Sequence, residues 1–240
     1  MRLDLFLAES RKADSRTDAK NFILAGAVTV DGKVINKPSF DVMGDEDISV
    51  DKSGKRYVSR GGLKLEAALD SFNIDVSDAM ALDIGASSGG FTDCLLQRGA
   101  KRVIAVDSGY GQMVEALRND ARVEVIENYN ARYMQPSDFD YVPNLAVMDV
   151  SFISAKLIFP AVSSVLASDG LFICLIKPQF EVGRSGLNKK GVVKNDALRK
   201  NAVDDVIEFA GCCGFTNLGL IESPIVGGDG NIEYLSYFKK

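Results

Sequence analysis

The sequence contains no histidine and no tryptophan among its 240 residues. Without histidine, a Ser-His-Asp or Cys-His hydrolase site cannot form, and a zinc site would lack its most frequent nitrogen ligand. Cysteine is also scarce, with no C-x-x-C pair, and we expect small core residues at Cys94, Cys174, Cys212 and Cys213. Acid–base chemistry must therefore come from Lys, Asp, Glu or Tyr, and we expect no metal site.

Long apolar runs are missing as well. The longest run, Leu171 to Ile176, has six residues, whereas a bilayer-spanning helix needs roughly 20. The first residues, MRLDLFLAES, are too acidic and too short in their apolar part for a signal peptide. We therefore expect a cytoplasmic protein with no membrane span.

The net charge of −5 argues against a uniformly basic nucleic-acid binder, but the basic residues are unevenly distributed. Residues 1–37 contain seven basic side chains against five acidic ones. Residues 184–200 contain six basic side chains against the single Asp196. This second run is compatible both with an RNA contact and with an ordinary solvated loop.

A change of pattern near residue 62 predicts two domains. Before it, apolar and polar residues alternate around Asp31-Gly32, which is typical of a β-hairpin. A polar, glycine-rich stretch follows from Lys52 to Gly62, and beyond it helices alternate with short apolar runs. We predict a small α+β domain at residues 1–55, a linker at residues 56–61 and an α/β domain at residues 62–240.

The larger domain is predicted to contain a mostly parallel sheet covered by helices on both faces. Repeated strand–helix units require crossover connections, and these produce parallel strands. The two final strands, Thr216–Ser223 and Asn231–Phe238, have no helix between them, so the last strand should run antiparallel. We expect helices over residues 63–72, 89–98, 112–118, 155–167 and 196–212.

The stretch LDIGASSGGFTD, Leu82 to Asp93, lies where a strand turns into a helix. Its G-x-x-x-G-G spacing with Asp83 at the strand end differs from the dinucleotide pattern G-x-G-x-x-G. An acid there would repel a pyrophosphate but suits a ligand with an amine and a sulfonium, such as S-adenosylmethionine. An ordinary tight turn remains the alternative. The predicted cofactor-binding residues are Asp83, Gly85, Ala86, Ser87, Gly89, Gly90, Phe91, Asp107 and Asp149.

Lys177 ends a strand that should be buried on both faces. In open parallel sheets, ligands bind beyond the carboxyl ends of the strands, so Lys177 should share one crevice with Asp83, Asp107 and Asp149. A lysine whose stem is buried while its amine reaches water is the alternative. Asp149 precedes Val-Ser-Phe rather than the prolines of base N-methyltransferases, and the chain lacks the Pro-Cys nucleophile of cytosine C5 enzymes. Methylation of a hydroxyl remains.

These motifs together resemble the TlyA family of bacterial rRNA 2'-O-methyltransferases, also labelled hemolysins, over essentially the whole chain. RLDLFL, SRTDAKNFILAGAVTVDG and NKP resemble an S4 RNA-binding domain. Residues 62–240 resemble the FtsJ-like methyltransferase fold, a seven-stranded Rossmann-like sheet whose last strand is antiparallel. The resemblance implies S-adenosylmethionine as cofactor, ribosomal RNA or ribosomal subunits as partner, and a ribose 2'-hydroxyl, expected on cytidine, as methyl acceptor.

The resemblance also implies which residues act. The family's Lys-Asp-Lys-Glu tetrad falls on Lys64, Asp149, Lys177 and Glu233. We expect Lys177 to orient and deprotonate the hydroxyl beside Lys64, while the two carboxylates hold the amines. Without the resemblance, Lys64 and Glu233 would be interpreted as exposed residues. The predicted RNA-binding residues are Arg11, Arg16, Lys20, Arg184, Lys189 and Lys190.

Three other interpretations stay open at this point. A membrane-active hemolysin would need an amphipathic or apolar insertion segment, and the predicted helices are short or patterned for a core. A catalytically silent rRNA-binding adaptor would keep the fold without the activity. A nicotinamide oxidoreductase fits the glycine spacing and Asp83 poorly.

Tyr110 and Phe152 could stack on a base, although packing is the commoner use of an isolated aromatic residue.

Overall fold

The computed structural model describes residues 1–24, 27–35, 37–50, 57–227 and 230–240. The chain divides into two compact units, Met1–Arg56 and Tyr57–Lys240. Each has its own hydrophobic core.

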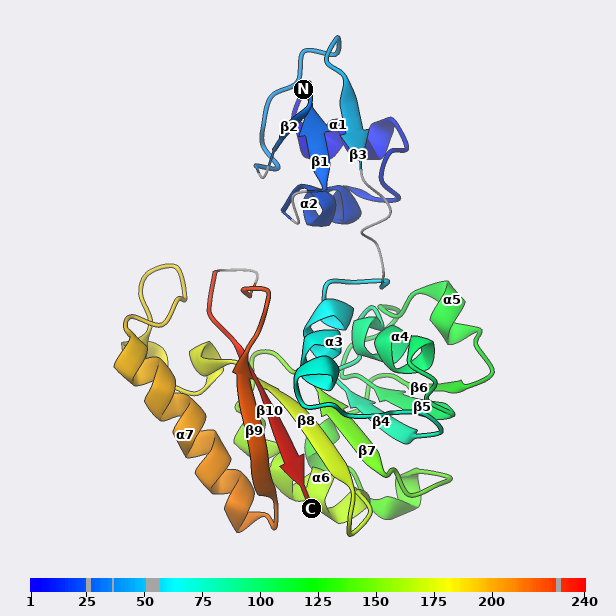
Figure 1. Ribbon diagram of the computed structural model, residues 1–240, viewed down its shortest axis with the longest axis vertical. Coiled ribbons are helices and arrows are strands. Elements are labelled where there is room, and N and C mark those ends of the chain that lie inside the picture. Colours follow the sequence, from blue (N-terminus) through cyan, green and yellow to red (C-terminus); the bar gives the residue numbers. More distant parts are fainter. Residues whose placement is uncertain (25–26, 36, 51–56, 228–229) are drawn as a thin grey trace. The chain divides into compact units, whose positions relative to one another are not determined.

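The smaller unit combines two helices with a three-stranded antiparallel sheet (Figure 1). Asp31 and Gly32 form the predicted hairpin turn with left-handed φ angles of 49° and 74°. Residues such as Leu3, Leu7 and Ile23 are fully buried in its core. Its elements are α1 (Leu3–Glu9), α2 (Arg16–Leu24), β1 (Val28–Val30), β2 (Lys33–Val34) and β3 (Ile48–Val50).

A buried carboxylate organises one side of this unit. Asp4 is fully buried, and it accepts hydrogen bonds from Arg2 Nε at 2.8 Å and from Arg16 Nε at 3.0 Å. The Arg2 hydrogen bond, with further help from Arg16, lowers the pKa of Asp4 to about 2 despite its burial. Asp4 therefore fixes the direction of two guanidinium groups at the surface.

The larger unit contains a seven-stranded sheet with the order β6-β5-β4-β7-β8-β10-β9. The strands β4 to β8 pair in parallel, whereas β10 runs antiparallel to both β8 and β9. This confirms the predicted fold class, including its antiparallel last strand. The strands are β4 (Met80–Ile84), β5 (Arg102–Val106), β6 (Val123–Ile126), β7 (Leu145–Met148), β8 (Leu171–Ile176), β9 (Thr216–Glu222) and β10 (Tyr234–Lys239).

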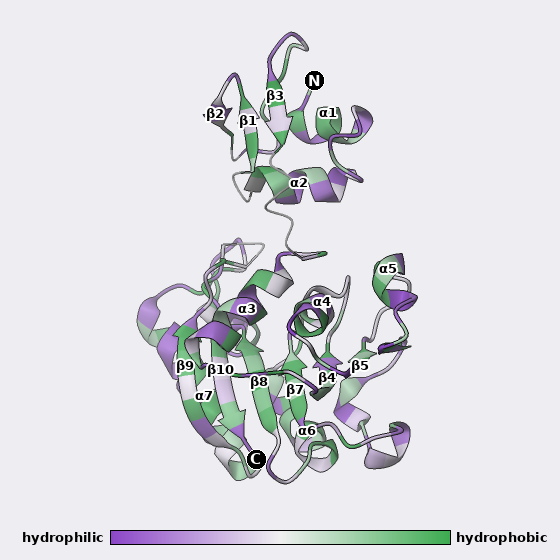
Figure 2. Cartoon of the chain, turned by 45° about the vertical axis from the view of Figure 1, so that its right-hand side comes forward, coloured by the Kyte–Doolittle hydropathy of each residue, from purple (hydrophilic) through white to green (hydrophobic). Residues whose placement is uncertain are grey.

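Helices cover both faces of this sheet, as its strands require. Ala81 packs with residues of α3 and α4, and its neighbour Leu82 packs with residues of α6 and α7. The central strands are therefore apolar on both faces, and Figure 2 shows this hydrophobic colouring along β7 and β8. The helices are α3 (Gly61–Ser71), α4 (Gly90–Gln97), α5 (Glu115–Arg118), α6 (Phe159–Val165) and α7 (Asp196–Cys212).

Several of the predicted element boundaries are wrong, and the helix expected over residues 112–118 begins only at Glu115. The helix expected over residues 155–167 is broken into a 3-10 turn at Ala155–Leu157 and α6, because Pro160 lacks the N–H that a continuous helix would need. The last strand begins at Tyr234 rather than at Asn231. The backbone carbonyl of Asn231 instead accepts a hydrogen bond from Gly227 N.

The described part of the predicted linker belongs to the larger unit. Tyr57 is buried in its core, and its hydroxyl donates to Glu66 Oε1 at 3.1 Å. The backbone N–H of Val58 donates to Asp93 Oδ2 at 2.8 Å, and α3 begins at Gly61. Tyr57 and Val58 are therefore attached to the helices α3 and α4.

We expect Asp4→Asn to lower the free energy of unfolding of the smaller unit by about 1–2 kcal/mol at neutral pH, because the two arginine contacts lose their charge assistance. The pKa of Asp4 is depressed to about 2 from 3.8. The stabilisation is therefore complete above about pH 4 and lost as the pH falls through about 2. Peptide-resolved hydrogen exchange over residues 3–50, corrected for intrinsic rates, measures both effects. Equal protection of the two proteins at neutral pH would contradict this expectation.

Candidate active site

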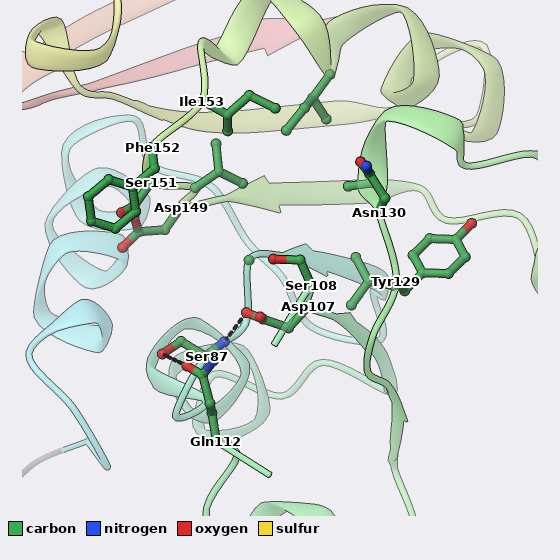
Figure 3. Close-up of a pocket in the computed structure, with 15 residues that line it drawn as sticks. Ser87, Asp107, Ser108, Gln112, Tyr129, Asn130, Asp149, Ser151, Phe152 and Ile153 are labelled. Carbon is green, nitrogen blue, oxygen red and sulfur yellow. Dashed lines mark hydrogen bonds between the residues drawn. The ribbon is translucent and has the colours of Figure 1, made fainter. Parts of the chain in front are cut away.

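A cavity of about 370 Å³ opens beyond the carboxyl ends of the central strands. Gly85, Asp107 and Asp149 line it, and they directly follow β4, β5 and β7. Figure 3 shows Asp107 and Asp149 facing this space from different strands. The position agrees with the rule that open parallel sheets bind ligands at this edge.

Glycine is needed at residue 85 because two strand ends meet there. Gly85 has a φ angle of 82°, and a Cβ atom at this residue would lie 2.4 Å from the backbone carbonyl oxygen of Asp149. The N–H of Asp149 donates to Ile84 O at 2.9 Å, which holds the same two segments together. The turn after β4 and the end of β7 therefore form one wall of the cavity.

Asp107 is held in a fixed orientation by backbone donors. Its Oδ2 accepts from Ser87 N at 2.8 Å, and its Oδ1 accepts from Gly109 N at 2.7 Å. Ser87 Oγ also donates to Gln112 Oε1 at 3.1 Å, and Figure 3 shows both Ser87 bonds. Each carboxylate oxygen has a second acceptor site, so Asp107 can still receive two ligand hydroxyls.

Asp83 lies beneath the turn instead of in the cavity wall. It is fully buried, and Thr92 Oγ1 donates to its Oδ2 at 2.6 Å. Within the described residues, its Oδ1 has no hydrogen-bond partner. Burial, together with the negative charges of Asp149 and Asp107, raises the pKa of Asp83 to about 7. Next to the ligand site, one oxygen of this carboxyl group thus has a hydrogen-bond partner and the other has none within the described residues.

The remaining predicted cofactor residues shape the turn from behind. Ala86 and Phe91 are buried, and Phe91, in the first turn of α4, packs in the core that also contains residues of α3. Gly89, with a φ angle of 95°, precedes α4. A Cβ atom on Gly90 would lie 2.1 Å from Ser59 Oγ. Of the predicted set, the structure brings Gly85, Ser87, Asp107 and Asp149 together around the cavity.

Three members of the predicted tetrad, Lys64, Lys177 and Glu233, line a second cavity of about 340 Å³, and the fourth, Asp149, lines the first cavity. Lys177 Nζ lies 2.5 Å from Asp149 Oδ1, and Lys64 Nζ lies 2.6 Å from Glu233 Oε2. Lys64 is 8% exposed and Glu233 is 3% exposed. The interpretation of these two as exposed surface residues is therefore wrong. The four side chains come from four segments: helix α3, the residue after β7, the residue after β8 and the residue before β10.

Two further polar residues form hydrogen bonds with members of the ion pairs, and neither was predicted from the sequence. Lys177 Nζ donates to Ser151 Oγ at 2.7 Å, and Gln179 Nε2 donates to Glu233 Oε1 at 3.2 Å. Ser151 follows Asp149 by two residues, and Gln179 follows Lys177 by two. Side chains two apart in an extended segment point the same way, so the spacing was an available signal for Ser151. Gln179 lies in the 3-10 turn Pro178–Phe180, where this rule does not apply.

Residues that were not predicted from the sequence form a further wall of the first cavity. Tyr129 and Asn130 line it from the segment after β6. Figure 3 shows them on the side of Asp107 remote from Phe152. They follow the carboxyl end of a parallel strand, so the rule that pointed to Asp107 would also have pointed to them.

The two cavities share part of their lining. Ser151 and Phe152 border both, and Asp149 lines the first while pairing with Lys177 of the second.

Phe152 is 92% exposed with a left-handed φ of 63°, and its ring centroid lies 5.3 Å from that of Phe180. Phe152 is therefore an exposed aromatic at the shared rim and not a core residue. Tyr110 is also exposed.

The predicted RNA-binding residues are exposed in their respective units. Arg184, Lys189 and Lys190 lie on the loop between β8 and α7, and Leu187 and Gly191 of this loop line the second cavity. In the smaller unit, Arg11, Arg16 and Lys20 are exposed.

Two basic residues of the 184–200 run have internal partners. Lys194 Nζ donates to Ser185 O at 2.8 Å. Arg199 Nε donates to Tyr234 OH at 3.0 Å, and its Nη2 donates to Asp196. These contacts mark both side chains as structural parts of the loop and of α7.

Within the described ranges, no helix is long and apolar enough to cross a membrane. The same residues contain no group of three or more Cys, Asp or Glu side chains arranged to hold a metal ion.

Comparison with known proteins reveals similarity over both units. The family model for FtsJ-like methyltransferases matches residues 57–240, and the model for S4 domains matches residues 1–48. A candidate rRNA methyltransferase of Bacillus subtilis, YqxC, is 46% identical over 98% of this chain and 84% of its own length. The 16S/23S rRNA (cytidine-2'-O)-methyltransferase TlyA of Mycobacterium tuberculosis is 41% identical over 99% of this chain and 89% of its own. A solved structure described as a candidate hemolysin from Streptococcus thermophilus has a TM-score of 0.80 at 43% identity, covering 100% of this chain and 88% of that one.

We expect Gly85→Ala to destabilise the larger unit more than Gly111→Ala does. Both glycines have left-handed φ angles, 82° and 68°, so each substitution costs about 1 kcal/mol of backbone strain. At Gly85 the new methyl group would also meet the Asp149 carbonyl, whereas at Gly111 it meets no atom within 4 Å. The unfolding temperature of Gly85→Ala should lie several degrees below that of Gly111→Ala, in a calorimetric comparison. Equal unfolding temperatures would rule out the close contact.

We expect the stability of the wild type to fall relative to Asp83→Asn as the pH rises from about 4 to about 7. The pKa of Asp83 is raised from 3.8 to about 7, so the folded state holds an extra proton across this window. Its contribution is complete below about pH 4 and is lost as the pH passes about 7, at about 1.4 kcal/mol per pH unit. Urea unfolding followed by circular dichroism measures it, with the exposed Asp140→Asn as a control that should parallel the wild type. Parallel curves for Asp83→Asn as well would show that Asp83 does not titrate in this way.

Proposed function

Because this chain belongs to the FtsJ-like methyltransferase family and carries an N-terminal S4 domain, we propose that it transfers a methyl group from S-adenosylmethionine to a ribose 2'-hydroxyl of ribosomal RNA. One observation supports this most directly. The cavity lined by Lys64, Lys177 and Glu233 shares Ser151 and Phe152 with the cavity at the glycine turn, and the ion pair between Lys177 and Asp149 links the two. A donor and an acceptor site are thus adjacent.

The first cavity has the features that the cofactor requires. Asp107 offers two oriented acceptor oxygens to a ribose, and Gln112, Tyr129 and Asn130 line the far side. Behind the turn, the buried Asp83 carboxyl group offers an acceptor oxygen, Oδ1, that has no hydrogen-bond partner within the described residues. When bound, S-adenosylmethionine supplies a methyl carbon activated by its sulfonium. Asp149 lines this cavity and pairs with the amine of Lys177.

Lys177 would act on the hydroxyl. A ribose 2'-hydroxyl is a weak acid and a poor nucleophile, so a positioned base must accept its proton. The Lys177 amine forms an ion pair with Asp149 and donates a hydrogen bond to Ser151 Oγ. A lysine amine has three hydrogen-bonding directions, so it can also contact the substrate hydroxyl. Lys177 can therefore orient the hydroxyl and receive its proton.

Lys64 and Glu233 would act on the same group at a distance. Both oxygens of Glu233 are engaged, one by Lys64 and one by Gln179, so the Lys64 amine is fixed in place. Its positive charge would stabilise the negative charge that develops on the hydroxyl oxygen during the transfer.

The RNA would be held by exposed basic residues in both units. The S4 domain presents Arg11, Arg16 and Lys20, and the loop beside the second cavity presents Lys189 and Lys190. Such contacts bind phosphates without reading sequence. We propose cytidine as the methylated nucleotide, following the activity named for the Mycobacterium tuberculosis relative. A ribosomal RNA substrate implies that the protein acts in the cytoplasm.

We expect Lys177→Ala to lower the rate of methyl transfer to ribosomal subunits by at least about 10²-fold, because the proton acceptor is removed. Affinity for S-adenosylmethionine should change little, since Lys177 lines the second cavity. The exposed Lys101→Ala serves as a matched control and should retain wild-type turnover. Mapping of 2'-O-methyl positions, with calorimetry for the cofactor, measures both effects.

Unchanged turnover in Lys177→Ala would remove this residue from the mechanism. A wild-type protein that binds the cofactor and ribosomal subunits but leaves the RNA unmodified would instead support the silent rRNA-binding adaptor.

A further inference from the structure

The loop between β8 and α7 contains a small hairpin at the rim of the second cavity. Leu187 and Val193 form an antiparallel bridge at its base, and Asn188 Oδ1 accepts from Lys190 N at 2.8 Å in its turn. We call residues 187–193 the basic hairpin, because its tip presents the exposed Lys189 and Lys190. Figure 1 shows this loop and the connection between β9 and β10 at the same end of the sheet.

A single buried amide fixes the basic hairpin to that connection. Asn231 is 2% exposed. Its Oδ1 accepts from Val193 N at 3.1 Å, and its Nδ2 donates to Gly191 O at 3.0 Å. Its backbone carbonyl accepts from Gly227 N at 2.8 Å. Both ends of the Asn231 amide are thus used to hold backbone groups about 40 residues away in the chain.

The same short segment also holds the tetrad. Glu233 follows Asn231 by two residues, and its carboxylate binds Lys64. Leu187 and Gly191 of the basic hairpin line the cavity that contains Lys64 and Lys177. The position of the two tip lysines relative to these amines is therefore set through Asn231. A merely structural role would be to satisfy the buried polar groups of Val193 and Gly191.

We propose that Asn231 is a positioning residue for the RNA substrate. It fixes the basic hairpin so that Lys189 and Lys190 bind backbone phosphates beside the ribose whose hydroxyl faces Lys177. The loop from Arg184 to Asn195 carries four basic residues and no acidic one, which suits phosphates. Without the two Asn231 bonds, the lysines remain but lose their fixed distance from the reacting centre. This inference rests on the proposed methyl transfer to ribosomal RNA.

The test is a double-mutant cycle measured on ribosomal subunits isolated without the modification. Lys189→Ala with Lys190→Ala should raise the KM for subunits roughly tenfold. It should also reduce the slope of log(kcat/KM) against log[salt] by about 1.4 to 1.8, the value for two phosphate contacts. Asn231→Ala alone should reproduce both changes. The triple variant should have the same KM and the same salt slope as Asn231→Ala alone. Once the hairpin is no longer fixed, the two lysines have no further contribution to lose.

Matched variants separate positioning from folding. Lys200→Ala lies in the same basic run but on α7, so its effect should multiply with that of Asn231→Ala. Asn231→Asp keeps an acceptor for Val193 N but loses the donor to Gly191 O, and we expect a loss of the same kind with the fold retained. Calorimetric affinity for S-adenosylmethionine, measured on each variant, should stay near the wild-type value, and cooperative thermal unfolding should show that each variant is folded.

An Asn231→Asp or Asn231→Ala protein with unchanged KM and salt slope would overturn the inference, as would losses that multiply with those of the lysine variants. Absence of methyl transfer by the wild type would overturn the proposed function itself. The two failures are therefore distinguishable.

Discussion

The buried ion pair between Lys64 and Glu233 is the interaction on which the second cavity depends. Its partners are 169 positions apart in the chain, and little solvent reaches either one. A buried charge left without its partner is strongly destabilising. Helix α3 can therefore pack on the sheet only with Lys64 beside the entry to β10. Gln179 binds the other oxygen of the same carboxylate, so the end of β8 is tied to this pair as well.

Asp149 connects the second cavity to the first cavity, at the glycine turn. Its carbonyl occupies the space that a side chain at residue 85 would need, and its carboxylate pairs with Lys177. Methyl transfer requires the donor carbon and the acceptor oxygen to be aligned within a few ångströms. A residue whose backbone shapes one cavity and whose side chain orients the amine of the other meets this requirement. The left-handed Phe152, three residues later, then stands at the rim common to both.

The sequence predicted those parts of the structure that local patterns determine. Apolar runs ending in Asp107, Asp149 and Lys177 were sufficient to place one site at the carboxyl edge of a parallel sheet. Lys64 could not be found this way, because its helix alone is compatible with an exposed lysine, and only the family resemblance pointed to it. Asn231 was assigned to a strand, since its partners lie about 40 residues away and leave no local pattern. The break before α6 was predictable, because Pro160 marks it.

The acidic net charge and the proposed RNA substrate are compatible because buried polar groups determine where the positive charges lie. Asp4 orients Arg16 in the smaller unit, and Asn231 holds the loop that carries Lys189 and Lys190. Uniform basic charge would raise binding to any RNA, because phosphate contacts do not depend on sequence. A few basic residues at fixed positions contribute less to such binding but define which phosphates fit when a ribose meets Lys177. Ordering flexible lysine-bearing loops beforehand also lowers the conformational entropy lost on binding. Selection of one hydroxyl among thousands is then a consequence of geometry and does not require a large positive charge.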